Sequence, residues 1–284
     1  MDHTTKSRIS VDTIPVALSV YSDGSVDVKV SKELKQKLAE STDKKPLILR
    51  AFLKDPAGLL AYRYFLDYVE DTYSDAVLSA HIMYVPNGRQ DRENGNDEVT
   101  NVFSLKSVAR LLDSDCLDKI VVTDPHSEVT VECLAAKVVS QYEVYEAIVS
   151  RFDFEADVVV APDKGARLKA AEIARRQERP LALAEKVRDP VTNQITGTKI
   201  IEGDVKGKRV VIVDDICDGG RTFKELAKVL KAEGATHVTL YVTHGLFSRY
   251  NQELKEDIDQ ILVYFNWSEE AQADPDFVKT YLAF

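Results

Sequence analysis

The stretch that decides the fold of this chain reads Arg209-Val-Val-Ile-Val-Asp-Asp-Ile-Cys-Asp-Gly-Gly-Arg-Thr-Phe223. It begins with a continuous apolar run, Val210 to Val213, which is typical of a strand buried on both faces of a parallel sheet. Carboxylates, two glycines, an arginine and a threonine follow, and a helical pattern begins at Phe223. A strand, an acidic pair, a glycine turn and a helix together predict a phosphate site at the carboxyl edge of an α/β sheet.

The carboxylates of this stretch restrict the kind of ligand. Glycines let backbone N–H groups close around an oxyanion, and a helix N-terminus favours negative charge. Asp214 and Asp215 would repel a phosphate unless they bind sugar hydroxyls or a divalent cation. They follow the apolar run, so we expect their carboxylates to project from the edge of the sheet. The stretch therefore predicts a site for a phosphorylated sugar with Mg²⁺ nearby.

Composition excludes several classes of protein. The 284 residues include 37 Lys and Arg against 47 Asp and Glu, a net charge of −10, whereas a general nucleic-acid binder needs a basic stripe or tail. The three cysteines lack metal-ligand spacing, which favours a reducing compartment. The N-terminus lacks the apolar core of a signal peptide, and no apolar run is long enough to span a membrane. We therefore expect a cytoplasmic protein that binds neither nucleic acid nor membrane.

Apolar runs alternate with amphipathic patterns along the whole chain. Strands are expected at 14–20, 25–30, 47–52, 80–85, 119–122, 156–161, 181–185, 209–216, 237–243 and 261–265. Helices are expected at 56–72, 105–112, 165–176 and 222–233. This alternation predicts parallel βαβ units, with a domain boundary inside residues 127–150. Residues 186–206 read as polar and irregular apart from a short return.

Further short segments identify a family. The 209–223 stretch resembles the ribose-phosphate motif of type I phosphoribosyltransferases and of ribose-phosphate pyrophosphokinases (PRPP synthetases). Segments that resemble the pyrophosphokinases occur in the right order, and they are Tyr21-Ser-Asp-Gly24, Tyr84-Val-Pro-Asn-Gly-Arg-Gln-Asp-Arg92, Thr123-Asp-Pro-His126, Ala161-Pro-Asp-Lys-Gly-Ala166, Glu185-Lys-Val-Arg188 and Thr243-His-Gly-Leu-Phe-Ser248. The ordered set resembles a divergent, short member of the ribose-phosphate pyrophosphokinase family.

The resemblance implies an architecture. It implies an α/β fold of two similar phosphoribosyltransferase-like domains with mainly parallel sheets. Residues 1–140 would form the N-terminal domain with the ATP-binding segment. Residues 141–284 would form the C-terminal domain with the ribose-phosphate loop and a mobile catalytic flap. It also implies a homo-oligomer, a dimer or larger.

The resemblance also implies a reaction and the residues that carry it. The β,γ-diphosphate of ATP would pass, with Mg²⁺, to the anomeric 1-hydroxyl of a 5-phosphorylated ribose, releasing AMP; ribose 5-phosphate would give PRPP. The ATP-binding residues would be Tyr21, Asp23, Arg89, Gln90, Asp91, Arg92 and His126. The ribose-phosphate-binding residues would be Asp163, Asp214, Asp215, Asp218, Gly219, Gly220, Arg221 and Thr222. His126 and Asp163 would bind the metal, and the catalytic residues would be Lys186, Arg188, His126 and Asp218.

The chain departs from the family pattern at several positions. The family's phosphate loop reads Asp-Thr-Gly/Ala-Gly-Thr, whereas this chain has Asp218-Gly-Gly-Arg-Thr222. An arginine there would crowd a small phosphate but could pair with a larger 5-substituent. ADP-ribose, giving ADP-ribose pyrophosphate for nucleotide or NAD synthesis, is therefore an alternative acceptor. Ser25 replaces an acidic residue, which weakens the case for adenine contacts from a neighbouring subunit. Residues 93–98 are acidic where the family is basic, which weakens the case for regulation by ADP or phosphate.

Two other classes of function remain open. A phosphoribosyltransferase would share only the 209–223 stretch, and the ATP-like segment 84–92 and the Lys186/Arg188 pair disfavour it. A non-catalytic regulatory homologue would commonly lose flap cations or metal ligands. This chain keeps Lys186, Arg188, His126 and Asp163.

Overall fold

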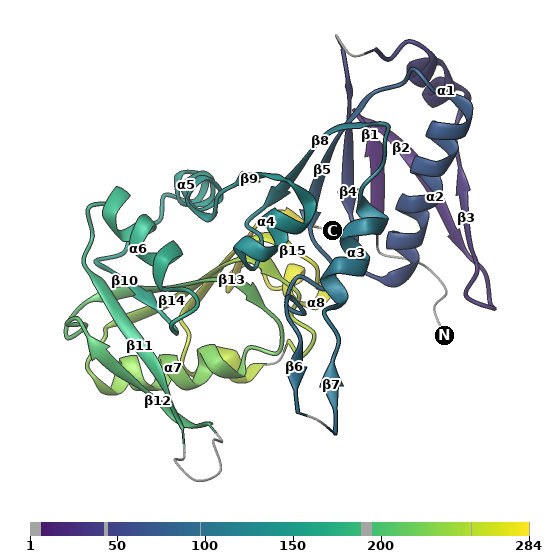
Figure 1. The fold of residues 1–284 in the computed structure, drawn as a ribbon. Helices are drawn as coiled ribbons and strands as arrows, with labels where there is room; N and C mark the ends of the chain where they lie inside the picture. The colour runs from purple at the N-terminus through teal and green to yellow at the C-terminus, as the bar shows by residue number, and fades with distance from the viewer. Residues whose placement is uncertain (1–6, 43–44, 97, 189–194, 251, 284) are drawn as a thin grey trace. The chain divides into compact units, whose positions relative to one another are not determined.

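The computed structural model describes residues 7–42, 45–96, 98–188, 195–250 and 252–283. The chain divides into two compact units, Met1–Val139 and Ser140–Phe284, and each is built around one seven-stranded sheet (Figure 1). Both units mix helices with strands that are partly or mainly parallel, so the predicted α/β class is confirmed.

The sheet of the first unit has the strand order β3-β2-β1-β4-β5-β8-β9. Its strands are β1 (Arg8–Val11), β2 (Ile14–Val20), β3 (Val26–Lys29), β4 (Leu47–Phe52), β5 (Leu78–Tyr84), β8 (Leu117–Thr123) and β9 (Lys137–Val139). Its helices are α1 (Lys32–Ala39), α2 (Pro56–Thr72), α3 (Ser104–Leu112) and α4 (Glu128–Leu134). A small hairpin, β6 (Asn94–Gly95) and β7 (Thr100–Asn101), stands apart from the sheet. Strands β4, β5, β8 and β9 pair in parallel, whereas β1 to β3 pair antiparallel.

The sheet of the second unit has the order β12-β11-β10-β13-β14-β15-β16. Its strands are β10 (Val158–Ala161), β11 (Leu181–Arg188), β12 (Ile195–Glu202), β13 (Arg209–Cys217), β14 (His237–Gly245), β15 (Gln260–Asn266) and β16 (Val278–Ala283). Its helices are α5 (Gln141–Phe152), α6 (Arg167–Arg176), α7 (Arg221–Ala232), the 3₁₀-helix η1 (Gln252–Glu256) and α8 (Glu269–Gln272). All neighbouring strands pair in parallel except β11 and β12.

Strand β13 is apolar without interruption because both of its faces are covered. Val210 and Ile212 belong to the core cluster that contains the α7 residues Phe223 and Leu226. The alternate residues Val211 and Val213 belong to the cluster with residues of α5 and α6. Successive side chains of a strand point to opposite faces, so each face of the central strand packs on its own helix layer. This packing fixes β13 in the middle of the unit.

The prediction of an irregular segment at 186–206 is wrong for residues 186–188 and 195–202, which are strand, and holds for residues 203–206. β11 extends to Arg188 and pairs antiparallel with β12, with Lys186 opposite Thr198. The hairpin is partly solvated on both faces, so polar and apolar residues do not alternate clearly. Its β-branched residues, such as Thr198 and Ile200, were the available signal for a strand. Residues 189–194 of the predicted flap lie outside the described residues.

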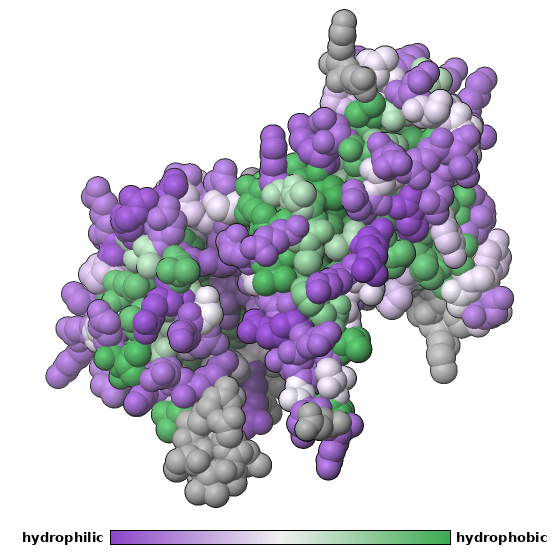
Figure 2. All heavy atoms as spheres, in the orientation of Figure 1, coloured by the Kyte–Doolittle hydropathy of each residue, from purple (hydrophilic) through white to green (hydrophobic). Residues whose placement is uncertain are grey.

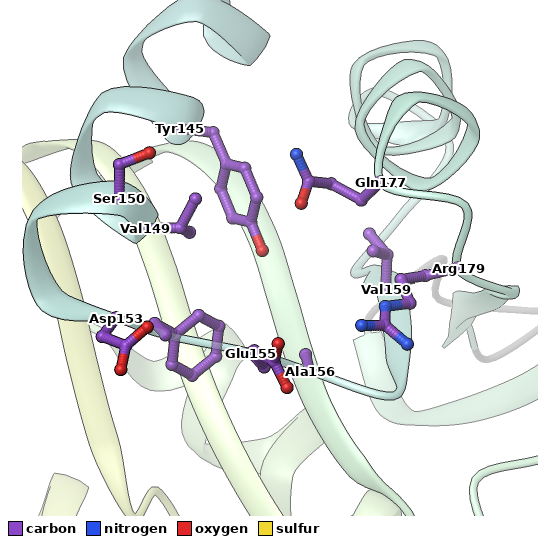
Figure 3. Close-up of a pocket in the computed structure, with 10 residues that line it drawn as sticks. Tyr145, Val149, Ser150, Asp153, Glu155, Ala156, Val159, Gln177 and Arg179 are labelled. Carbon is purple, nitrogen blue, oxygen red and sulfur yellow. The ribbon is translucent and has the colours of Figure 1, made fainter.

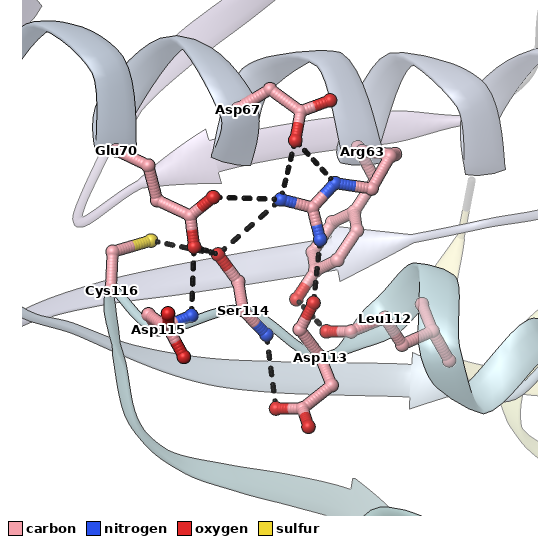
Figure 4. A network of polar contacts seen from close by, with 9 residues as sticks. Arg63, Asp67, Glu70, Leu112, Asp113, Ser114, Asp115 and Cys116 are labelled. Atoms are coloured by element: carbon pink, nitrogen blue, oxygen red, sulfur yellow. Dashed lines mark hydrogen bonds and ion pairs between the residues drawn. The ribbon is translucent and has the colours of Figure 1, made fainter.

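A polar network in the first unit joins α2 to the connection between α3 and β8 (Figure 4). The Arg63 guanidinium donates to the Asp113 carbonyl oxygen at 2.5 Å and to Glu70 Oε2 at 3.2 Å. Glu70 Oε1 accepts hydrogen bonds from the Ser114 hydroxyl and, at 2.7 Å, from the Asp115 N–H. Burial acts to raise the pKa of Glu70, but these two donors and Arg63 outweigh it and lower that pKa. The network therefore stabilises the folded chain through the ionised carboxylate.

We expect Glu70→Gln to lower the free energy of unfolding at pH 7 by about 1 kcal/mol, because an amide cannot accept at both oxygens. The folded-state pKa of Glu70 is lowered from 4.5, so its stabilisation is present above pH 4.5 and is lost as pH falls through the lowered value. The difference between wild type and variant should therefore shrink in acid. Urea unfolding at pH 7 and pH 3 measures it. Asp67→Asn is the control, since Asp67 makes an exposed ion pair with Arg63 and should have a smaller effect. Equal stability of wild type and Glu70→Gln at pH 7 would contradict this role.

Hydrophilic residues cover most of the visible face of each unit in Figure 2, in line with the acidic, highly charged composition. Within the described ranges, no helix combines the length and apolar character needed to cross a membrane.

Candidate functional site

Predicted site residues meet at the carboxyl edge of the second sheet. β10 and β13 are parallel neighbours, with Val160 opposite Ile212. Asp163 follows the end of β10, and Asp214 and Asp215 lie near the end of β13. Carboxyl ends of parallel strands share one edge, which is where open α/β sheets bind ligands. The negative charge of Asp163 acts on Asp214, which agrees with this placement.

Asp214 and Asp215 follow the apolar run and lie within β13, as the predicted strand at 209–216 implied. The strand continues to Cys217 because β14 pairs with it as far as Gly245. Asp215 is buried, and Asp214 Oδ1 accepts a hydrogen bond from the Asp215 N–H at 2.9 Å. Burial raises the pKa of Asp214 well above its ordinary value, and the charges of Asp215 and Asp163 raise it further. A bound cation or a sugar hydroxyl would relieve this repulsion.

The lysine of the predicted flap lies in the same cluster. Lys186 Nζ is 2.8 Å from Asp163 Oδ2, and the two side chains are 27% and 30% exposed. Asp163 Oδ1 accepts hydrogen bonds from the N–H groups of Gly165 at 2.9 Å and Ala166 at 3.3 Å. Burial acts to raise the pKa of Asp163, but Lys186 and these N–H groups lower it overall. Arg188 ends β11, and its side chain lies outside the described part of the chain.

The turn between β13 and α7 has the form predicted for a phosphate loop. Gly220 has φ 74° and caps α7, and a Cβ there would come within 2.9 Å of Leu254 Cδ2. The first N–H groups of a helix have no intrahelical acceptor, so those around Thr222 can donate to an anion. Asp218 accepts a hydrogen bond from the Ser248 hydroxyl, which ties the loop to the end of β14.

Arg221 does not crowd this loop in the way that the sequence suggested. It is the first residue of α7, and its side chain is 88% exposed. Its Nε lies 2.8 Å from Glu225 Oε1, one helical turn further on. The guanidinium therefore lies along the outside of the helix, paired with a carboxylate.

Gly220→Ala should lower the free energy of unfolding by about 1–3 kcal/mol, because an added Cβ is strained at φ 74° and meets Leu254. Gly219→Ala is the matched control, since its Cβ would find its nearest neighbour at 3.9 Å. Thermal unfolding of both variants, each compared with wild type, measures the difference. Equal stability of the two variants would contradict the tight fit at Gly220.

The predicted ATP segment of the first unit also forms a cluster. Asp91 is 4% exposed, and Arg92 Nε donates to its Oδ1 at 2.9 Å. Burial acts to raise the pKa of Asp91, but Arg92 and the nearby His126 help to lower it. A Cβ on Gly88 would lie 3.8 Å from His126 Cβ, so the segment after β5 contacts the segment after β8. The exposed side chains of Arg89 and Gln90 belong to the same turn.

The remaining predicted ATP-binding residues lie on the β2–β3 turn, and their side chains make polar contacts within it or with the start of β3. The Tyr21 hydroxyl is 3.5 Å from Asp27 Oδ2. Asp23 Oδ1 accepts from the Ser25 hydroxyl at 2.7 Å and N–H at 2.9 Å, which lowers the pKa of Asp23. A role of Tyr21 and Asp23 in binding adenine stays a prediction.

Arg249 lies beside the predicted phosphate loop, although the sequence did not single it out. Its Cδ lies 3.9 Å from the position that a Cβ on Gly219 would take. The available signal was its place directly after the Thr243–Ser248 segment that resembles the pyrophosphokinases.

A cavity of 220 Å³ in the second unit lies away from this cluster (Figure 3). It is lined by Tyr145, Val149, Phe154 and Val159, with Gln177 and Arg179 at its edge. It lies near the amino-terminal ends of β10 and β11, whereas Asp163 and Asp214 lie at the carboxyl ends. The cavity is therefore not part of the candidate site.

Among the described residues, no group of three or more His, Cys, Asp or Glu side chains is arranged to hold a metal ion. Mg²⁺ is commonly held by only one or two carboxylates together with substrate phosphates. Asp163 and Asp214 supply hard oxygen donors of that type.

Comparison with known proteins shows which protein families this chain resembles. Residues 136–274 match the family model of the phosphoribosyl transferase domain. The ribose-phosphate pyrophosphokinase of Nitrosomonas europaea is 33% identical over 190 residues, 66% of this chain and 59% of that protein. That of Mycoplasma genitalium is 34% identical over 197 residues, 66% of this chain and 56% of that protein. The predicted resemblance is thus confirmed, although the chain spans only somewhat over half the length of these relatives.

A solved structure shares the fold. The crystal structure of phosphoribosylpyrophosphate synthetase from Mycobacterium smegmatis aligns with a TM-score of 0.72. The alignment covers 94% of this chain and 85% of that chain at 22% sequence identity. The arrangement of strands and helices in this chain is therefore that of a known enzyme fold.

Proposed function

From the similarity of this chain to ribose-phosphate pyrophosphokinases, we propose that it transfers the β,γ-diphosphate of ATP to the anomeric hydroxyl of a 5-phosphorylated ribose and releases AMP. The observation that carries the proposal is the contact of Lys186 with Asp163 at the sheet edge that also holds Asp214. The contact supports the proposal because diphosphoryl transfer would need a cation beside the carboxylates that bind the sugar. Neither a simple anion site nor a plain sugar site needs both.

The second unit would bind the acceptor. The N–H groups of the Asp218–Thr222 turn and the α7 N-terminus would hold the 5-phosphate. Asp214 and Asp215 would accept hydrogen bonds from the ribose hydroxyls. They lie near the end of β13, a few residues before the turn.

Cationic residues would serve the nucleotide. Phosphoryl-type transfer needs in-line positioning and positive charge where negative charge develops. Lys186 supplies such a charge, and we propose Arg188 as the second. Arg89, Gln90, Arg92 and His126 of the first unit would bind ATP. Arg92 would use the part of its guanidinium that Asp91 leaves exposed, since its side chain is 69% exposed.

Asp163 in the second unit and His126 in the first would each bind Mg²⁺, which neutralises phosphate charge when it is bound. Binding of the metal to Asp163 would replace the contact of Asp163 with Lys186. The ammonium group of Lys186 would then be available to bind a phosphate. The Gly165 and Ala166 N–H groups, which donate to Asp163 Oδ1, would keep the carboxylate oriented.

Incubation with Mg·ATP and ribose 5-phosphate tests the proposal. We expect AMP and a 1-diphosphorylated ribose in equal amounts. Release of diphosphate that depends on a nucleobase, with no AMP, would support a phosphoribosyltransferase. Binding of ATP and ribose 5-phosphate without any product would support a non-catalytic regulatory homologue.

ADP-ribose is the second candidate acceptor, and Arg249 favours it. The turn that would hold the 5-phosphate has this exposed cation beside Gly219. The AMP assay should therefore be run with ADP-ribose in parallel. We also propose a homo-oligomer, a dimer or larger, in a cytoplasmic setting; light scattering of the purified chain measures its mass.

A further inference from the structure

Arg249 is held in place by contacts of the residues before it. The N–H groups of Leu246 and Phe247 both donate to the Cys217 carbonyl oxygen, at 2.9 and 3.1 Å. Ser248 donates to Asp218, the first residue of the predicted phosphate loop. The segment that carries Arg249 is therefore fastened to the start of that loop.

The side chain of Arg249 lies beside the loop itself. Its Cδ is 3.9 Å from the position of a Cβ on Gly219, and the residue is exposed. In the part of the chain that the structure describes, no ion pair joins its guanidinium to a carboxylate. Arg221 differs, because Glu225 neutralises its charge at 2.8 Å. Arg249 is thus the cation at this turn with charge left to offer an anion.

We infer that Arg249 determines acceptor specificity by binding the outer phosphate of a 5-diphosphoryl ribose. This inference rests on the proposed function and names its substrate class. A phosphate held by the N–H groups of the turn would lie against Gly219. Ribose 5-phosphate has only this one phosphate. In ADP-ribose a second phosphate is attached to it and would lie further out from the turn. The planar guanidinium can make two hydrogen bonds to that phosphate.

The test compares Arg249→Ala with wild type in the full-length chain. The measurement is kcat/KM for AMP formation from Mg·ATP with ADP-ribose and with ribose 5-phosphate. We expect kcat/KM for ADP-ribose to fall about 10–100-fold, because hydrogen bonds to charged groups are among the strong ones. The value for ribose 5-phosphate should change by less than about twofold, and Arg249→Lys should retain part of the preference.

Arg179→Ala is the matched control. It removes one exposed arginine from the same unit, near the amino-terminal end of β11 and away from the carboxyl edge. Arg179→Ala should leave kcat/KM for both acceptors unchanged. A calorimetric titration of ADP-ribose into wild type and Arg249→Ala, without ATP, gives a readout that does not depend on turnover.

Three outcomes would overturn the inference. Arg249→Ala could lower kcat/KM equally for both acceptors, which would mean that the guanidinium binds the 5-phosphate itself. The substitution could leave kcat/KM for both acceptors unchanged, which would make Arg249 a surface charge only. Wild type could use ribose 5-phosphate but not bind ADP-ribose. If wild type forms no AMP with either acceptor, the proposed function fails, and the calorimetric comparison still decides whether Arg249 binds the diphosphate.

Discussion

Lys186→Ala is expected to lower turnover by about 10²–10³-fold while the chain stays folded, because it removes positive charge from the place where the diphosphate develops charge. The affinity for ATP should change much less, since other residues would bind the nucleotide in the ground state. Arg188→Ala should behave in the same way. Initial rates of AMP formation over a range of ATP concentrations separate kcat from KM.

Lys199→Ala is the control for this prediction. Lys199 lies on β12 of the same hairpin, opposite Glu185, and its side chain is exposed. It should keep near-normal turnover. Near-normal turnover in Lys186→Ala and Arg188→Ala would show that these cations of the hairpin do not take part in the mechanism. Asp163→Asn would then be introduced into wild type and into Lys186→Ala. The difference between its effects on turnover in the two proteins measures the functional coupling of the two residues, whose contact is 2.8 Å.

Asp214→Asn should abolish most activity and yet raise the thermal stability of the chain. Burial, together with Asp215 and Asp163, raises the pKa of Asp214 in the folded state. A carboxyl group with a raised pKa stabilises the fold fully below its ordinary pKa of 3.8 and loses that contribution as pH rises through the raised value. At pH 7.5 the wild type therefore bears a cost that asparagine, which does not ionise, avoids. Asparagine Oδ1 can still accept the Asp215 N–H.

The expected rise in Tm at pH 7.5 is a few degrees, since 1 kcal/mol corresponds to about 2–4 °C for a domain of this size. The gain should disappear as pH approaches 4, where aspartic acid is itself neutral. Calorimetry at both pH values measures it, and AMP assays measure the lost function. Asp276→Asn, on the exposed surface, changes the net charge equally and should leave both properties unaltered. Lower stability of Asp214→Asn at pH 7.5 would contradict the repulsion.

Local sequence determined the central strand and the turn after it. The run Val210–Val213 predicted a strand covered on both faces, and the structure packs its alternate residues on two helix layers. The glycines before α7 predicted a turn, and Gly220 adopts φ 74° there. Both features depend on neighbouring residues and backbone sterics, which a short stretch contains.

The hairpin β11–β12 shows where that reasoning stops. Its residues are polar enough to resemble a loop, and only pairing between distant residues, such as Lys186 with Thr198, makes them strands. A solvated strand lacks the alternation that a buried face imposes.

The sequence by itself determined the family resemblance, the phosphate turn and the residue types of the site, since each is carried by a contiguous motif. Only the tertiary structure decided that Lys186 contacts Asp163 and that Arg249 lies against Gly219. The physical reason is strand order. Placing β10 between β11 and β13, and β13 beside β14, brings the ends of separate segments to one edge, and no local pattern encodes which strands become neighbours.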